Sequence, residues 1–215
     1  LDANQLDLDR GEKEGLAKSL FDRLRLTPDR IVGLQQSILE IMAFKDPIGD
    51  VLRGSKLENG LRIEQVRVPF GVIGVIYEAR PNVTIDIAAL AIKSGNAAVL
   101  RGGSAAIETN RVLVGLIQQA LEDAGISKDL VQTVDDYGRD GGTEMMQARG
   151  LVDVLIPRGS ANLIQTVVNE SKVPVIETGD GIVHLFIDKD ADREKAIEIA
   201  NNSKTHRVSV CNSLE

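Results

Sequence analysis

The feature that most constrains this fold is a continuous apolar run, Gly71–Tyr77, followed by alternating helix and strand patterns. Successive side chains of a strand point to opposite faces, so a wholly apolar strand must be covered on both. Helices are expected over about 83–93, 105–124 and 160–169, and strands over 95–100, 131–134 and 152–156. Strands that alternate with amphipathic helices favour parallel βαβ units. The sequence therefore predicts an α/β fold with a parallel sheet flanked by helices.

The segment before this run predicts two helices and a hairpin. A first helix is expected over about 11–25. Thr27-Pro28 is typical of an N-cap followed by proline at the first helical position, and this second helix extends to about Ala43. Asn59-Gly60 then joins Val51–Leu57 to Leu61–Val68 as a hairpin.

The segment after residue 170 predicts two short strands, 174–177 and 184–187, and a last helix over about 191–203. Aromatic residues make up only 3% of the chain and tryptophan is absent, so the core must consist of aliphatic side chains.

Charge and cysteine content exclude several classes of function. The net charge of −7 disfavours nonspecific binding to nucleic acid or to an anionic membrane surface. No apolar run approaches the roughly 20 residues that span a bilayer. One cysteine and a polar N-terminal segment without a signal peptide predict a cytoplasmic protein. His184 and His206 do not lie at metal-ligand spacing with cysteines or carboxylates, so no metal site is predicted.

Two turns between a strand and a helix have the composition of phosphate-binding turns. They are Arg101-Gly102-Gly103-Ser104 and Pro157-Arg158-Gly159-Ser160. Backbone N–H groups at a helix start, with an arginine beside them, favour anionic oxygens. The alternative is that each is only a turn with a serine cap. The complete dinucleotide fingerprint is absent, because the Gly179-Asp180-Gly181 segment lacks the third glycine.

Further candidates follow the first apolar strand and lie near the end of the chain. Asn82 can donate its amide to an oxyanion, or it can be the N-cap of the next helix. Arg80 can bind a carboxylate or phosphate, or form a surface ion pair. Glu177 lies in a turn that is interpreted as a solvated loop rather than a general-base site. Cys211, the only cysteine, is either a buried packing residue or a reactive thiol near His206 and Arg207.

Taken together and in order, these segments resemble a known family. The sequence carries Val68–Thr84, Lys93–Ser104, Ile156–Ser160, Val175–Gly181 and Thr205–Cys211. They are similar to the glutamate-5-semialdehyde dehydrogenase branch of the aldehyde dehydrogenase superfamily, also called the gamma-glutamyl phosphate reductases. The resemblance covers nearly the whole chain from about residue 10. It implies an aldehyde dehydrogenase-like fold with a Rossmann-type sheet and a protruding hairpin.

The resemblance implies an NADPH-dependent step of proline biosynthesis, in which gamma-glutamyl phosphate is reduced to glutamate 5-semialdehyde with release of phosphate. Cys211 would be the nucleophile that forms a thioester, and Asn82 would stabilise the oxyanion. Arg80 would bind substrate. The residues expected to bind the NADPH cofactor are Arg101, Gly102, Ser104, Gly159 and Ser160. Glu177 receives no role as a base, because a phosphorylating reductase does not activate water.

The resemblance also implies a domain organisation and partners. Residues 1–50 and 71–205 would form the NADPH-binding domain, 51–70 an oligomerisation hairpin, and 206–215 the start of the catalytic domain. A homo-oligomer and a contact with glutamate 5-kinase are expected for the complete protein. This chain is then expected to be a fragment without catalytic activity of its own. The alternative that it comes from a bifunctional protein with a preceding kinase domain stays open.

The sequence departs from the usual family pattern before the cysteine. Thr205–Cys211 has His206 and Val208 where relatives usually carry glutamine and proline. The missing proline puts the geometry of the nucleophile loop in question. A function of a different class also stays open: a noncatalytic nucleotide-binding or interaction module that retains the enzyme-like sequence.

Overall fold

A four-stranded parallel sheet forms the centre of the protein, as the apolar run predicted. The computed structural model describes residues 1–178, 182–206 and 213–214. The sheet order is β5-β4-β3-β6. Its strands are β3 (Val72–Tyr77), β4 (Ala97–Arg101), β5 (Val131–Thr133) and β6 (Val154–Arg158). The chain runs outward from β3 through β4 to β5, and then returns to place β6 on the other side of β3. This order confirms the predicted α/β fold.

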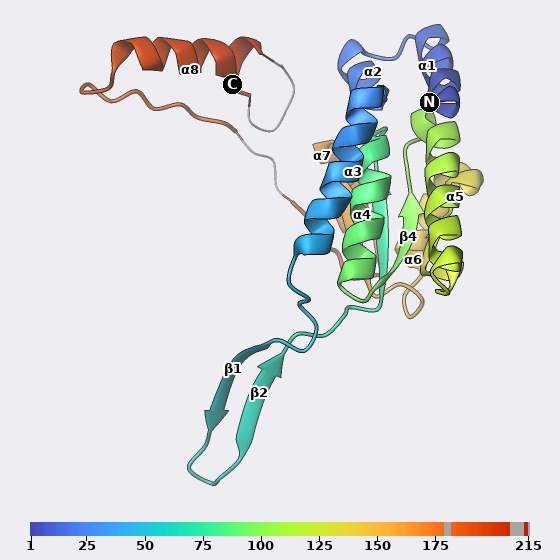
Figure 1. Cartoon of the computed structure of the whole chain (residues 1–215), viewed down its shortest axis with the longest axis vertical. Coiled ribbons are helices and arrows are strands. Elements are labelled where there is room, and N and C mark those ends of the chain that lie inside the picture. The colour runs from blue at the N-terminus through green and yellow to red at the C-terminus, as the bar shows by residue number, and fades with distance from the viewer. Residues whose placement is uncertain (179–181, 207–212, 215) are drawn as a thin grey trace.

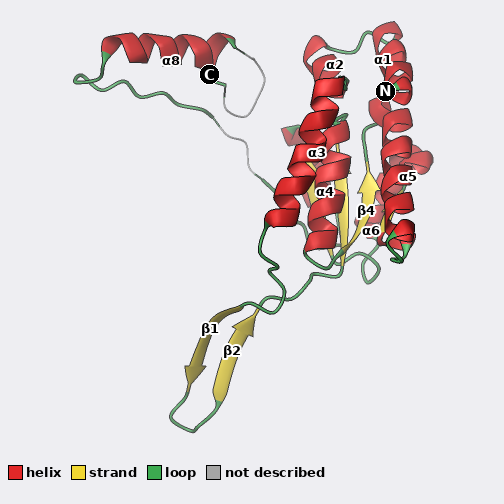
Figure 2. Ribbon diagram, in the orientation of Figure 1, coloured by secondary structure: helices red, strands yellow, loops and turns green. Residues whose placement is uncertain are grey.

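Helices cover both faces of the sheet (Figure 2). One face is covered by α4 (Pro81–Lys93) and α5 (Ile107–Asp123), and α3 (Pro28–Ala43) packs against α4. The other face is covered by α6 (Gly138–Gln147) and α7 (Ala161–Glu170). Three short 3₁₀ turns, at Ser104–Ala106, Lys128–Leu130 and Asp135–Tyr137, connect these elements.

Alternate residues of β3 enter two separate aliphatic clusters. Val75 packs with the helices α4 and α5, whereas Ile76 packs with Met145 of α6 and Val167 of α7. Both strand residues are almost completely buried. The continuous apolar run is therefore explained by burial on both faces, which is typical of parallel sheets.

The N-terminal region differs from the predicted single helix over 11–25. It forms α1 (Asp2–Lys13) and α2 (Lys18–Leu24), separated at Gly15, whose φ of +71° lies in the left-handed region. The prediction was wrong because α1 buries the polar residues Asn4 and Asp7, which carry no hydrophobic periodicity. The second predicted helix is confirmed: the Thr27 hydroxyl accepts the Arg30 N–H at 3.2 Å, and Pro28 opens α3.

The predicted hairpin is confirmed and projects away from the rest of the molecule (Figure 1). It consists of β1 (Val51–Lys56) and β2 (Arg62–Val66), which pair antiparallel. Gly60 in the turn adopts a φ of +87°, as the Asn-Gly signal requires. Every residue of both strands is exposed, including Leu52 and Ile63. A two-stranded ribbon with exposed apolar side chains offers unpaired strand edges to another chain or segment.

The C-terminal region contains the other corrections. Neither 174–177 nor 184–187 forms a strand; Val175 makes one isolated bridge to Leu155, and 184–187 has no regular structure. The last predicted helix is confirmed as α8 (Arg193–Thr205), which stands apart from the sheet (Figure 1). The helix α6 was missed because its glycines obscured the helical pattern. Within the described residues, no helix has both the length and the apolarity needed to cross a membrane.

Candidate functional site

The turns that follow β3, β4 and β6 meet at one edge of the sheet. Ile76 lies in register with Arg101, and Tyr77 lies in register with Arg158, so the three strands end together. The strands added after β3 lie on both sides of it: β4 and β5 lie on one side, and β6 lies on the other. The strand order therefore reverses at β3. In open α/β sheets, ligands bind at the carboxyl ends of strands at such a reversal. The turns selected from the sequence after β3, β4 and β6 therefore lie side by side.

The turns after β3 and β6 are joined through Glu78. Its N–H donates to the Arg158 carbonyl oxygen at 3.2 Å. Its side-chain Oε1 accepts the Ser160 N–H at 2.8 Å, at the N-terminus of α7. Gly159 permits this approach, because a Cβ there would lie 2.8 Å from the Glu78 side chain. Ser160 is also the side-chain cap of α7, as the alternative reading of this turn predicted.

The turn after β4 packs against the turn after β3. A Cβ on Gly103 would lie 2.7 Å from the backbone nitrogen of Ala79, so a larger residue would force the two backbones apart. The N–H of Gly102 donates to Asp135 Oδ1 at 2.6 Å in a buried position. Ser104 is exposed, and Arg101 is half-buried with its Nε donating to the Gly138 carbonyl oxygen at 3.3 Å.

A buried chain of polar groups supports these turns. The Tyr77 hydroxyl lies 2.7 Å from the Thr84 hydroxyl, which donates to Asn110 Oδ1 at 3.0 Å. Asn110 Nδ2 in turn donates to Asp135 Oδ2 at 3.2 Å. Burial raises the pKa of Tyr77 well above its usual range. Burial also raises the pKa of Asp135, although the hydrogen bonds from Gly102 and Asn110 act in the opposite direction.

This raised pKa predicts how Asp135 contributes to stability as pH changes. A carboxyl whose folded pKa exceeds its unfolded pKa stabilises the fold below the unfolded pKa, and this contribution disappears as pH rises through the folded pKa. We expect the free energy of unfolding of the wild type, minus that of Asp135→Asn, to fall as pH rises from below 3.8 through the folded pKa. Urea unfolding at a series of pH values measures this difference.

The matched control for this pH series is Asp136→Asn. It removes an exposed carboxylate from the same turn, one that pairs with Arg111, and it leaves the buried polar chain intact. A difference between wild type and Asp135→Asn that rises with pH over the same interval would contradict the prediction.

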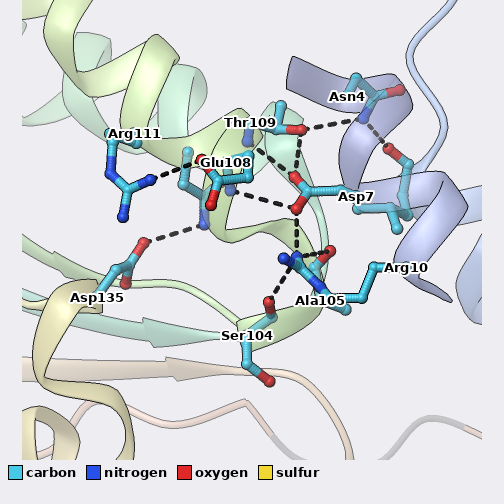
Figure 3. Close-up of polar contacts among 11 residues, drawn as sticks. Asn4, Asp7, Arg10, Ser104, Ala105, Glu108, Thr109, Arg111 and Asp135 are labelled. Atoms are coloured by element: carbon cyan, nitrogen blue, oxygen red, sulfur yellow. Dashed lines mark hydrogen bonds and ion pairs between the residues drawn. The ribbon is translucent and has the colours of Figure 1, made fainter. Parts of the chain in front are cut away.

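The N-terminus of α5 is capped by α1, far away in sequence (Figure 3). Asp7 is fully buried and accepts the Thr109 N–H at 2.8 Å, the Thr109 hydroxyl at 2.7 Å and the Glu108 N–H at 3.2 Å. Arg10 pairs with Asp7 and also donates to the carbonyl oxygens of Ser104 and Ala105, at 3.2 and 3.3 Å. The positive end of α5 is thus neutralised from inside the protein.

Arg80 and Asn82 lie at the start of α4. Arg80 is the N-cap residue and is half-buried, and α4 begins at Pro81. Asn82 lies inside the first turn, so the alternative that made it the N-cap is wrong. It is exposed, and its Nδ2 donates to Asp86 Oδ2 at 3.2 Å. A cavity of about 390 Å³ opens beside both residues.

Cys211 and Arg207 lie outside the described residues, as does the Gly179–Gly181 segment. Glu177 is exposed, in keeping with the solvated loop that the sequence suggested. The part of the chain that the structure describes contains no group of three or more His, Cys, Asp or Glu side chains able to hold a metal ion.

Sequence reasoning missed the buried carboxylates that organise the site. Asp7 and Asp135 belong to polar segments, and their partners lie 102 and 33 residues away. No local pattern marks such a pairing, because it depends on which strands and helices become neighbours. Asn4, Asp7 and Gly11 lie on one face of α1 at helical spacing, but this spacing does not indicate which partner Asp7 meets.

Comparison with known proteins places this geometry in a family. A family model described as the aldehyde dehydrogenase family matches residues 36–213. The chain belongs to the aldehyde dehydrogenase family. The match covers the hairpin, all four strands of the parallel sheet and α8.

The relatives described next are all named gamma-glutamyl phosphate reductase. A gamma-glutamyl phosphate reductase of Leifsonia xyli is 62% identical over the whole chain, which covers 51% of that relative. A crystal structure of the Thermotoga maritima protein of that name aligns with a TM-score of 0.89 at 41% identity, over the whole chain and 52% of that protein. The Saccharomyces cerevisiae protein of that name aligns at 0.74 and 34% identity, over 97% of the chain and 53% of its own. The chain thus spans about half the length of these relatives.

The family implies a nicotinamide cofactor. The turn that precedes α7, at residues 158–160, fits the pyrophosphate of such a cofactor. The Ser160 N–H already binds an anionic oxygen, that of Glu78, at the positive end of a helix. The Gly102 N–H fits less well for direct contact, since it is buried and bound to Asp135. Ser104 is exposed beside it and is accessible to a ligand.

Proposed function

We propose that this chain is the cofactor-binding half of an NADPH-dependent reductase that converts gamma-glutamyl phosphate to glutamate 5-semialdehyde and phosphate. The proposal is carried by three turns that lie together where the strand order of the parallel sheet reverses, at β3. These turns are 78–82, 101–104 and 158–160. The names of the full-length relatives support the choice of substrate.

The proposed chemistry begins at Cys211. Its thiolate attacks the acyl carbon of the substrate, the carbon–sulfur bond forms, and phosphate leaves with the electron pair of the carbon–oxygen bond. The amide of Asn82, exposed at the start of α4, donates to the oxyanion that develops on the acyl oxygen. NADPH held by the turns at 101–104 and 158–160 would supply the hydride for reduction of the acyl group, and Cys211 would leave as a thiolate when the aldehyde forms.

The proposed cofactor residues lie on either side of β3. Gly159 and Ser160 would hold the pyrophosphate at the N-terminus of α7. This requires Glu78 to leave the Ser160 N–H, because two anions cannot share that position. Arg101, Gly102 and Ser104 would lie at the adenosine end. The half-buried guanidinium of Arg101 is the candidate partner of the 2′-phosphate that distinguishes NADPH from NADH.

Titration of this chain with NADPH and NADH tests the proposal. We expect micromolar binding of NADPH, followed by its fluorescence, and weaker binding of NADH. Arg101→Gln should weaken NADPH binding by about tenfold, the loss expected for one charge-assisted contact, and leave NADH binding unchanged.

Arg62→Gln is the matched control, since it removes the same charge from the exposed hairpin. A chain that is folded by circular dichroism and binds neither nucleotide would contradict the cofactor assignment. Equal losses for NADPH and NADH in Arg101→Gln would remove the proposed role of Arg101 at the 2′-phosphate.

The exposed hairpin also supports a proposal about assembly. β1 and β2 present Val51, Leu52, Ile63 and Val66 to solvent, each between 41% and 55% exposed. We infer that the complete protein covers this ribbon with a second copy of the chain, because isolated two-stranded ribbons are only marginally stable in water.

A further inference from the structure

The cavity beside Arg80 and Asn82 is lined by an unusual concentration of arginines. Its volume is about 390 Å³, within the range of roughly 300–1,000 Å³ typical of small-molecule sites. The guanidinium-bearing residues come from α2, from the segment before α3, from α3 itself and from the start of α4. The arginine pocket is defined by Arg23, Arg25, Arg30 and Arg80. Asn82, the proposed oxyanion donor, completes one wall.

Arg30 fixes the backbone that carries two of the other arginines. Its Nη1 donates to the carbonyl oxygens of Asp22 and Arg25, at 2.5 and 2.7 Å. Its Nη2 donates to Asp22 Oδ1 at 2.7 Å. The guanidinium of Arg25 lies over the Phe21 ring, 5.3 Å from its centroid. The backbone that carries Arg23 and Arg25 and the guanidinium of Arg25 are therefore positioned before any ligand binds, which reduces the entropy cost of binding.

The charge balance around the arginine pocket favours an anion. The chain as a whole carries a net charge of −7, yet four arginine residues line this one cavity. Carboxylates near the cavity are already engaged: Asp22 pairs with Arg30, and Asp86 accepts hydrogen bonds from Asn82 and Ser37. Like charges that share a cavity repel one another, so an anionic group bound between them is stabilised.

We propose that the arginine pocket binds an anionic oxygen group of the substrate, with Arg23 and Arg25 as binding residues in addition to Arg80. The inference rests on the proposed function in one respect, namely that Asn82 faces the reacting carbon from the wall of the same cavity. The planar fork of a guanidinium matches both a phosphate and a carboxylate. The proposed substrate carries one of each, so the shared chemistry is an oxyanion and its source is an experimental question.

Calorimetric titration of this chain with inorganic phosphate and, separately, with L-glutamate tests the site. We expect one of the two to bind at low ionic strength. Arg25→Gln should weaken that binding by about tenfold, the usual effect of losing one charge-assisted hydrogen bond, and Arg23→Gln/Arg25→Gln should weaken it further. Arg25 is exposed, so its replacement leaves the fold intact even if the double variant does not fold.

The matched control is Arg53→Gln, which removes the same charge from the exposed hairpin and should leave binding unchanged. Binding of phosphate assigns the pocket to the leaving group, and binding of glutamate assigns it to the amino-acid carboxylate. Binding of neither anion, or equal losses in Arg25→Gln and Arg53→Gln, overturns the proposal.

Titration of the same samples with NADPH separates this inference from the proposed function. NADPH binding without anion binding overturns the arginine pocket and leaves the reductase proposal standing. Anion binding that is lost in Arg25→Gln, in a chain that does not bind NADPH, supports the pocket and contradicts the cofactor assignment.

Discussion

Asp7→Ala is expected to lower the free energy of unfolding by about 3–5 kcal/mol, the cost of breaking an ion pair whose carboxylate is fully buried. Asp7 is fully buried and pairs with Arg10 while it accepts two backbone N–H groups of α5 and the Thr109 hydroxyl. Its loss leaves these donors inside the protein without an acceptor. Typical domains are stable by only about 5–15 kcal/mol, so this single change removes a large part of the total.

Urea unfolding followed by circular dichroism measures this effect. Asp9→Ala is the control on the same helix, because Asp9 is exposed and bonds only locally, to Gln5 at 2.7 Å. Exposed substitutions of this kind change stability by about 0.5 kcal/mol or less. If Asp7→Ala costs no more than Asp9→Ala, the docking of α1 on the N-terminus of α5 is not a major source of stability.

Cys211→Ala should lower kcat by about 10⁴-fold or more in a chain extended to the full length of its relatives, as removal of a covalent nucleophile does in other enzymes. The proposed thioester cannot form without the thiol, whereas the cofactor turns at 101–104 and 158–160 are unaffected. NADPH binding should therefore stay at the wild-type value. Steady-state turnover of gamma-glutamyl phosphate and nucleotide titration together measure the two effects.

Mass spectrometry adds a direct readout for Cys211. Wild-type protein mixed with substrate in the absence of NADPH should gain the mass of the glutamyl group, and Cys211→Ala should gain none. A variant with unchanged turnover, or an acyl group found on another residue, would contradict the role of Cys211. It would also favour the alternative of a binding module that retains an enzyme-like sequence.

Local sequence signals determined most of the regular structure. The continuous apolar run of β3 required burial on both faces, and the aliphatic stripe of α5 required contact with a sheet. Thr27-Pro28 and Asn59-Gly60 set a helix start and a hairpin turn through backbone preferences that need no tertiary context. The family resemblance selected the turns at 78–82, 101–104 and 158–160, and the structure brings these turns together.

The tertiary structure decided where the polar groups go. Three buried or half-buried carboxylates accept backbone N–H groups from segments that are distant in sequence. Asp7 accepts from α5, Asp135 from Gly102 and Glu78 from Ser160. The arginine pocket likewise depends on the packing of α3 against α4, which brings Arg30 and Arg80 to one cavity. Hydrophobic periodicity reports which face of an element is buried. It carries no information about which partner a buried carboxylate or arginine will meet, because that depends on strand order and helix packing.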